Sequence, residues 1–143
     1  MTIASLLAAG GCSGSEAPET NKPEPLEINN ALTDAEKEAG ILTAEVMWKM
    51  GRIGSQTLSA DGGKLLYTLT EYNMAENRGI TSLVLRDMAT GEEVRLTDNN
   101  STNTAPQWLD NETIAFMSNR SGEMQVWSFD SNGDNLKQVT DIA

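Results

Sequence analysis

The side chains that most often carry out catalysis are scarce in this sequence. Its 143 residues contain no histidine and a single cysteine, Cys12. A chain without histidine cannot by itself supply a Ser-His-Asp or Cys-His catalytic group, and it lacks the commonest zinc ligand. The nucleophile motif G-x-S-x-G is also absent, because the stretch 11–15 ends in serine where the motif needs glycine. We therefore expect no catalytic residue on this chain, and any enzyme activity would need residues from elsewhere.

Acidic residues near the C-terminus have part of the spacing of a calcium-binding loop. Asp130 and Asp134 are followed by Asp141, eleven residues after the first of them. The sixth position of such a loop is glycine but here is Asn135, and the segment before it has the pattern of a strand. The Asn-Gly pair at 132–133 is typical of a hairpin turn. We expect a hairpin here, with no metal site and no cofactor.

The charge balance excludes one class of partner. The chain has 10 basic and 21 acidic residues, a net charge of −11. Phosphate backbones repel an acidic chain, so nucleic acid is not an expected partner. No apolar run approaches the roughly 18 residues that a membrane span needs.

Residues 1–12 resemble the end of a bacterial lipoprotein signal peptide. An apolar run from Ile3 to Ala9 is followed by two glycines and then Cys12. In such signals the cysteine receives the lipid, so Cys12 is the lipidation candidate, and the resemblance implies the bacterial cell envelope with a lipid anchor as the contact with membrane. Two departures are the missing Lys or Arg before the run and alanine at position 9 in place of leucine. A start codon assigned too far downstream would explain the missing basic residue. The alternative to a lipoprotein signal is a frayed terminus with an incidental cysteine.

The rest of the first third consists of a linker and two short helices. Residues 13–31 are rich in Pro, Ser and Glu and poor in apolar side chains, which predicts a flexible acidic linker. Within 32–52, the sequence from Thr33 to Glu36 is a capping box that opens a helix ending at Gly40. Thr43 is placed to cap a second short helix.

The last ninety residues repeat. Short alternating apolar segments separated by turn residues predict β-strands, and the segments of the first half recur in the second. The early part of the repeat has a spacing of 49 residues and the later part a spacing of 43. The matched pairs are Asp61 and Asp110, Tyr67 and Phe116, Leu83 and Val126, and Leu96 and Val139. The drop of six predicts a longer loop in the first copy, from Glu71 to Gly79.

Each copy predicts four strands. They are expected at 55–59, 64–71, 81–87 and 93–97 in the first copy, and at 105–109, 112–118, 124–130 and 136–140 in the second. A four-stranded antiparallel unit repeated every 40 to 50 residues is typical of a β-propeller blade. The expected fold is therefore all-β, with blades at 53–98 and 99–143. A ring needs about four to eight blades, so two of them form an incomplete propeller.

The first repeat resembles a known family of enzymes. The segment from Val46 to Asn73 follows the pattern W…GR…S-P-D-G-K…Y that opens the propeller of bacterial prolyl oligopeptidase family serine peptidases, of the dipeptidyl and acylaminoacyl peptidase type. Ala60 replaces the proline of the pattern, and Gly63 is either an added or a substituted residue. The segment from Asp87 to Thr97 then follows D-x-x-T-G-x-x-x-x-L-T. The segment from Pro106 to Gly122 is similar also to the repeats of TolB-type periplasmic propellers.

The resemblance implies a role without catalytic residues for this chain. In the family the catalytic serine, aspartate and histidine lie in a C-terminal α/β-hydrolase domain, and the propeller limits access to short peptides. The implied partners are that domain and peptide substrates. The alternative is a TolB-like propeller that binds other proteins and has no enzyme activity.

Three further groups of residues are candidates for binding, and each has a structural explanation. Glu92 and Glu93 resemble the glutamate pair with which dipeptidyl peptidases hold a substrate's amino terminus, but they begin a strand after a turn, which favours a solvated edge. The three tryptophans are expected to pack between blades, at equivalent positions. Three glycosylation sequons are expected to be polar residues of surface loops. The tryptophans are Trp48, Trp108 and Trp127, and the sequons begin at Asn100, Asn111 and Asn119.

Overall fold

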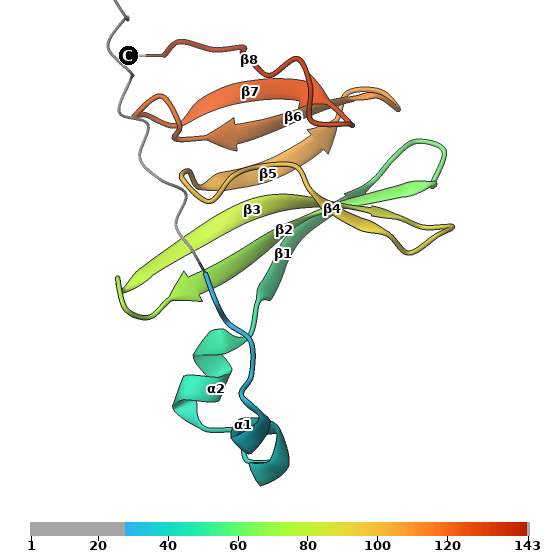
Figure 1. Cartoon of the computed structure of the whole chain (residues 1–143). Coiled ribbons are helices and arrows are strands. Elements are labelled where there is room, and N and C mark those ends of the chain that lie inside the picture. The colour runs from blue at the N-terminus through green and yellow to red at the C-terminus, as the bar shows by residue number, and fades with distance from the viewer. Residues whose placement is uncertain (1–27, 143) are drawn as a thin grey trace, which may run out of the picture.

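The computed structural model describes residues 28–142 as two short helices followed by eight strands (Figure 1). Cys12, the signal-like segment 1–12 and most of the linker 13–31 lie outside the described residues. Neither helix is long and apolar enough to cross a membrane. The helices are α1 (Asp34–Ala39) and α2 (Ala44–Lys49), and the strands are β1 (Arg52–Leu58), β2 (Lys64–Asn73), β3 (Arg78–Asp87), β4 (Glu93–Arg95), β5 (Asn103–Trp108), β6 (Thr113–Ser118), β7 (Gln125–Asp130) and β8 (Lys137–Gln138).

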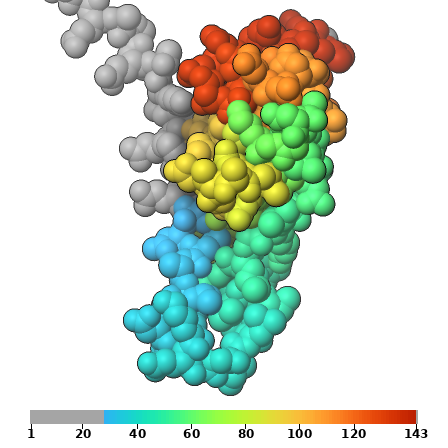
Figure 2. All heavy atoms as spheres, turned by 90° about the vertical axis from the view of Figure 1, so that its right-hand side faces the viewer, coloured from blue at the N-terminus to red at the C-terminus, as the bar shows by residue number. Residues whose placement is uncertain are grey.

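The strands form two antiparallel sheets, in the orders β1-β2-β3-β4 and β5-β6-β7-β8. This confirms the predicted all-β fold of two four-stranded blades. We call the first sheet blade 1 and the second blade 2. The two blades lie face to face, and the helices extend from blade 1 on the side away from blade 2 (Figures 1 and 2). The register reproduces the repeat, since Tyr67 pairs with Val84 in blade 1 and Phe116 pairs with Trp127 in blade 2.

The two blades use the same local devices to end their strands. The hydroxyl of Thr97 accepts a hydrogen bond from the backbone N–H of Leu83 at 2.9 Å. Forty-three residues later, the hydroxyl of Thr140 accepts one from the N–H of Val126, also at 2.9 Å. In each blade the threonine hydroxyl takes the place of a backbone carbonyl acceptor at the point where the outermost strand leaves the sheet. The backbone N–H of the neighbouring strand therefore keeps a hydrogen-bond partner.

The prediction of a longer loop from Glu71 to Gly79 is wrong. The extra residues continue the ladder between β2 and β3, with Tyr72 opposite Gly79 and Asn73 opposite Arg78. Only residues 74–77 form the turn. The insertion therefore lengthens a hairpin instead of adding a loop, because paired antiparallel strands satisfy backbone groups that a loop would leave to solvent.

The core lies between the blades. Leu66 and Leu83 of blade 1 meet Ile114, Phe116 and Phe129 of blade 2, and all five are at most 2% exposed. The two phenylalanine rings are tilted with their centroids 4.6 Å apart. Each strand directs alternate side chains to opposite faces, so this core uses one face of each blade. The contact makes the two sheets one packed unit.

The helices are joined by a salt bridge. Thr33 and Glu36 form the predicted capping box, and Lys49 of α2 binds the Glu36 carboxylate at 2.8 Å. Hydrogen bonds from Lys49 and then from the Thr33 backbone N–H lower the pKa of Glu36 to about 2. The carboxylate thus caps one helix and binds the other.

We expect acid to weaken the salt bridge between Glu36 and Lys49. A carboxyl group with a lowered folded-state pKa stabilises the fold above its ordinary pKa of 4.5, and that contribution is lost as the pH falls toward about 2. An NMR titration of the Glu36 carboxyl carbon should therefore give a midpoint near 2, and the urea midpoint should fall between pH 4.5 and 2. Glu36→Gln should make the urea midpoint less dependent on pH in this range, whereas Glu38→Gln, on the same helix, is the control. A Glu36 midpoint near 4.5 would contradict the salt bridge.

Candidate functional site

The described residues hold no metal-binding cluster: within 28–142, no group of three or more Cys, Asp or Glu side chains is placed to share an ion. The residues from Asp130 to Asn135 form a turn closed by their own side chains. Asn135 Nδ2 donates to an Asp130 carboxylate oxygen at 2.6 Å. Asp141 lies near the other end of β7, since Ile142 N–H bonds to Gln125. The length of that strand, about 16 Å at the usual rise, keeps Asp141 from joining the turn.

Glu92 and Glu93 do not form a carboxylate pair that is free to bind an amine. Arg86 donates to Glu93 at 2.7 Å, and this bond lowers the pKa of Glu93. The neighbouring Tyr67 is buried, and desolvation raises the pKa of its hydroxyl group. Glu93 is therefore half-exposed and ion-paired on the face of blade 1 that lies away from blade 2.

Two of the three tryptophans pack between the blades as expected, but they are not at equivalent positions, because Trp108 corresponds to Ser59 and Trp127 to Val84 in the repeat. Trp108 donates from Nε1 to the carbonyl of Thr57 across the blades, at 3.4 Å, and Trp127 packs against the core. Trp48 lies on α2 and packs edge-on against Tyr72, with ring centroids 5.0 Å apart. Sequence spacing could not place Trp48, because it precedes the first blade and has no counterpart in the repeat.

The sequon asparagines also differ from one another. Asn111 is exposed in the turn between β5 and β6, as expected of a surface loop. The side-chain oxygen of Asn119 accepts a hydrogen bond from the Thr102 backbone at 2.9 Å, so it holds the connection between the blades. Asn100 is half-buried in that connection, and its side-chain nitrogen is buried.

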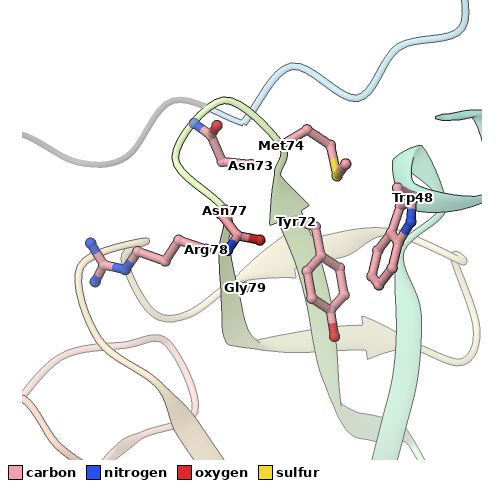
Figure 3. A pocket seen from close by; sticks show the side chains of 7 residues that line it. All are labelled: Trp48, Tyr72, Asn73, Met74, Asn77, Arg78 and Gly79. Atoms are coloured by element: carbon pink, nitrogen blue, oxygen red, sulfur yellow. The ribbon is translucent and has the colours of Figure 1, made fainter.

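A hollow of about 210 Å³ lies beside the long hairpin of blade 1. We call it the hairpin hollow. It is lined by Trp48 from α2, Tyr72 from β2, Gly79 from β3, and the hairpin residues Asn73, Met74, Asn77 and Arg78. Figure 3 shows the rings of Trp48 and Tyr72 side by side, with Arg78 pointing away from them. The apolar walls and nearby amides suit recognition of a small group.

The aromatic wall of the hairpin hollow is fixed by a cation. The guanidinium of Arg52 lies 4.8 Å from the centre of the Trp48 ring and 4.7 Å from that of Tyr72. An arginine over two aromatic faces stabilises both rings in place. This arrangement gives a physical role to the W…GR part of the pattern that opens the segment from Val46 to Asn73, because Trp48 and Arg52 are in contact.

The position opposite Tyr72 requires a residue without a side chain. A Cβ atom at Gly79 would come within 2.8 Å of Cε1 of the Tyr72 ring. The ring therefore lies directly over the glycine of the neighbouring strand, and this contact sets where the ring can meet Trp48.

We expect Gly79→Ala to push the Tyr72 ring away from Trp48. Overpacking of this kind costs about 1–3 kcal/mol of folding free energy. Urea unfolding should show the loss, and tryptophan fluorescence should report the changed surroundings of Trp48. In a Tyr72→Ala background the same glycine change should cost much less, since the clashing ring is gone. Equal costs in both backgrounds would contradict the contact.

Comparison with known proteins finds relatives that match more than half of this chain. No protein-family model matches the chain. It is 30% identical over 111 residues, 77% of its length, to dipeptidyl-peptidase 5 of Porphyromonas endodontalis. The chain spans only 16% of that relative.

Solved structures share the fold. An acylaminoacyl peptidase of Pyrococcus horikoshii matches 67% of this chain with a TM-score of 0.55 and 21% identity, over 15% of its own length. A putative TolB of Agrobacterium tumefaciens matches 66% of the chain with a TM-score of 0.51 and 26% identity, over 31% of its own length. The fold is therefore that of two β-propeller blades, and the matches to a dipeptidyl-peptidase and to acylaminoacyl peptidases support a propeller fragment of a prolyl oligopeptidase family peptidase.

Proposed function

We propose that the two blades are part of a propeller that gates the access of short peptides to a serine peptidase domain. The observation that carries the proposal is the 30% identity to a dipeptidyl-peptidase across 77% of this chain. In this proposal the catalytic serine, aspartate and histidine belong to a C-terminal α/β-hydrolase domain. Residues 28–142 then contribute the cover of the active site and no catalytic group.

The packing of the blades supports a ring. Blade 2 places Ile114 and Phe116 against blade 1, and the equivalent residues of blade 1, 49 positions earlier, are Leu65 and Tyr67. On the same face of blade 1, Ile53 is 66% exposed. This face can therefore receive a further blade by the same contact. A closed ring of such blades is rigid, and it would exclude folded proteins while helping to keep water from the reacting groups.

We expect the intact protein to hydrolyse short chromogenic peptides and to leave folded proteins uncut. Leu66→Ala removes a fully buried side chain between the blades and should loosen the cover, so that longer peptides are cleaved as well. Leu109→Ala is the matched control, because Leu109 is 64% exposed in a turn. The measurement is the rate of cleavage against peptide length.

The outcomes separate the two parts of the proposal. Absence of peptide hydrolysis by the intact protein would contradict the peptidase assignment. Hydrolysis with the same length limit in Leu66→Ala and Leu109→Ala would contradict gating alone. A G-x-S-x-G motif in the gene downstream of residue 143 would support the hydrolase domain.

A second candidate function is a TolB-like propeller that binds proteins without enzyme activity. The observation that favours it is the 26% identity to a putative TolB, with a TM-score of 0.51. Retention of partner proteins by the intact protein, together with no peptide hydrolysis, would favour this function over the first.

The proposed place of action is the bacterial cell envelope, with a lipid on Cys12 as the anchor. The apolar run before a lone cysteine, followed by a Pro- and Glu-rich linker, supports this. One acyl chain binds membranes only marginally, so stable anchoring needs more than one.

We expect Cys12→Ser to release the protein from membranes in cells that process lipoproteins. The wild-type protein should partition into detergent and begin, after processing, at a modified Cys12. Ser13→Ala, which leaves the thiol in place, is the control. An unmodified Cys12 in the wild-type protein, found by mass spectrometry, would overturn this assignment.

A further inference from the structure

The hairpin hollow adjoins a second hollow at the point where the described part of the chain begins. The second hollow has a volume of about 290 Å³ and shares Asn73 and Met74 with the hairpin hollow. Its wall also includes Asn29 and Asn30, which come just before α1. Figure 3 shows the segment before α1 passing the hairpin that carries Asn73 and Met74. The residues that immediately precede Ile28 are therefore tethered beside the hairpin hollow.

The surface of the hairpin hollow is apolar and has basic groups beside it. Trp48 is 39% exposed and Met74 is 57% exposed. Arg78 lines the hollow and donates to a backbone carbonyl at 3.2 Å, and Arg52 lies over the rings of Trp48 and Tyr72. Within residues 28–142, neither arginine has a carboxylate at salt-bridge distance, and no acidic side chain lines either hollow. In a chain with a net charge of −11, this surface suits a ligand that is both apolar and acidic.

The sequence just before Ile28 has both properties. Residues 23–27 read Pro-Glu-Pro-Leu-Glu, and they lie outside the described residues. Proline favours the polyproline II conformation, which has three residues per turn. In that conformation Pro23 and Leu26 share one face, and Glu24 and Glu27 share another. Aromatic-lined grooves recognise such segments because a preformed polyproline II helix loses little entropy on binding.

The segment is close enough in sequence to reach the hairpin hollow. Leu26 comes three residues before Asn29, a separation of about 9 Å in the polyproline II conformation. A short tether of this kind gives an effective concentration of about 1 mM. Weak binding is then sufficient, because a Kd of about 0.2 mM keeps the segment bound for about five-sixths of the time.

We propose that residues 23–27 of this chain bind in the hairpin hollow. The apolar face of the segment lies against the rings of Trp48 and Tyr72, and its acidic face lies toward Arg52 and Arg78. Binding shortens the linker to residues 13–22 and fixes the point at which it leaves blade 1. The proposal depends neither on peptidase activity nor on a lipid anchor.

The test is cleavage of the intact protein by a protease that cuts after glutamate. The bond after Glu27 ends the proposed docked segment, and the bond after Glu19 lies outside it. Cleavage follows the fraction of time for which a site is released. We expect Trp48→Ala to speed cleavage after Glu27 about sixfold and to leave cleavage after Glu19 unchanged. Met88→Ala, which alters an exposed side chain in the turn after β3, is the control and should match the wild type at both sites.

Pro23→Ser tests the other partner of the contact and leaves the blades unchanged. It should speed cleavage after Glu27 in the wild-type protein but not in Trp48→Ala, where docking is already lost. Pro25→Ser also removes a proline, but from a different face, so its effect should be smaller. Equal rates after Glu27 in Trp48→Ala and Met88→Ala, or an equal effect of Pro23→Ser in both backgrounds, would overturn the proposal. Protection that disappears on dilution would overturn it as well, because the hollow would then hold the segment of a second copy.

Discussion

The structure depends on one constraint: a four-stranded sheet cannot cover its own faces. Blade 1 has Leu66 and Leu83 on one face, and both are fully buried only because Phe116 and Ile114 of blade 2 lie over them. Burying an apolar side chain of this size contributes about 1.5–3 kcal/mol, so the contact between blades is where the fold gains its stability. The opposite face of blade 1 has the same need, which is the physical basis for proposing a ring.

Stacking also explains why the turns of the two blades match so closely. Two sheets can repeat the same contact only if their edges end at equivalent places. The hydroxyls of Thr97 and Thr140 provide this by pairing with a backbone N–H where β4 and β8 end. The hydrogen bond from Trp108 to Thr57 then holds the innermost strands of the two blades together. Local polar contacts thus set the geometry that the apolar contact requires.

The parts that could be predicted from sequence are those with local causes. Alternation of apolar residues and a repeat at fixed spacing were enough for two blades, and the capping box of α1 is visible in Thr33 and Glu36. The parts that could not be predicted arise from pairing across strands. The extra residues extend the ladder and bring Tyr72 opposite Gly79, and the residue types alone do not distinguish a longer ladder from a loop. The unpartnered indole N–H of Trp127 is likewise visible only in three dimensions.

The hairpin hollow lies where the blades cease to be copies of each other. The β2–β3 hairpin of blade 1 has longer paired strands than the β6–β7 hairpin of blade 2, and it provides most of the hairpin hollow. Residues that repeat must keep the sheets stacked, so they are not free to acquire a binding role. Insertions and connections carry no such requirement. Recognition by this propeller is therefore expected at the hairpin of blade 1, and the repeated strands serve to position that hairpin.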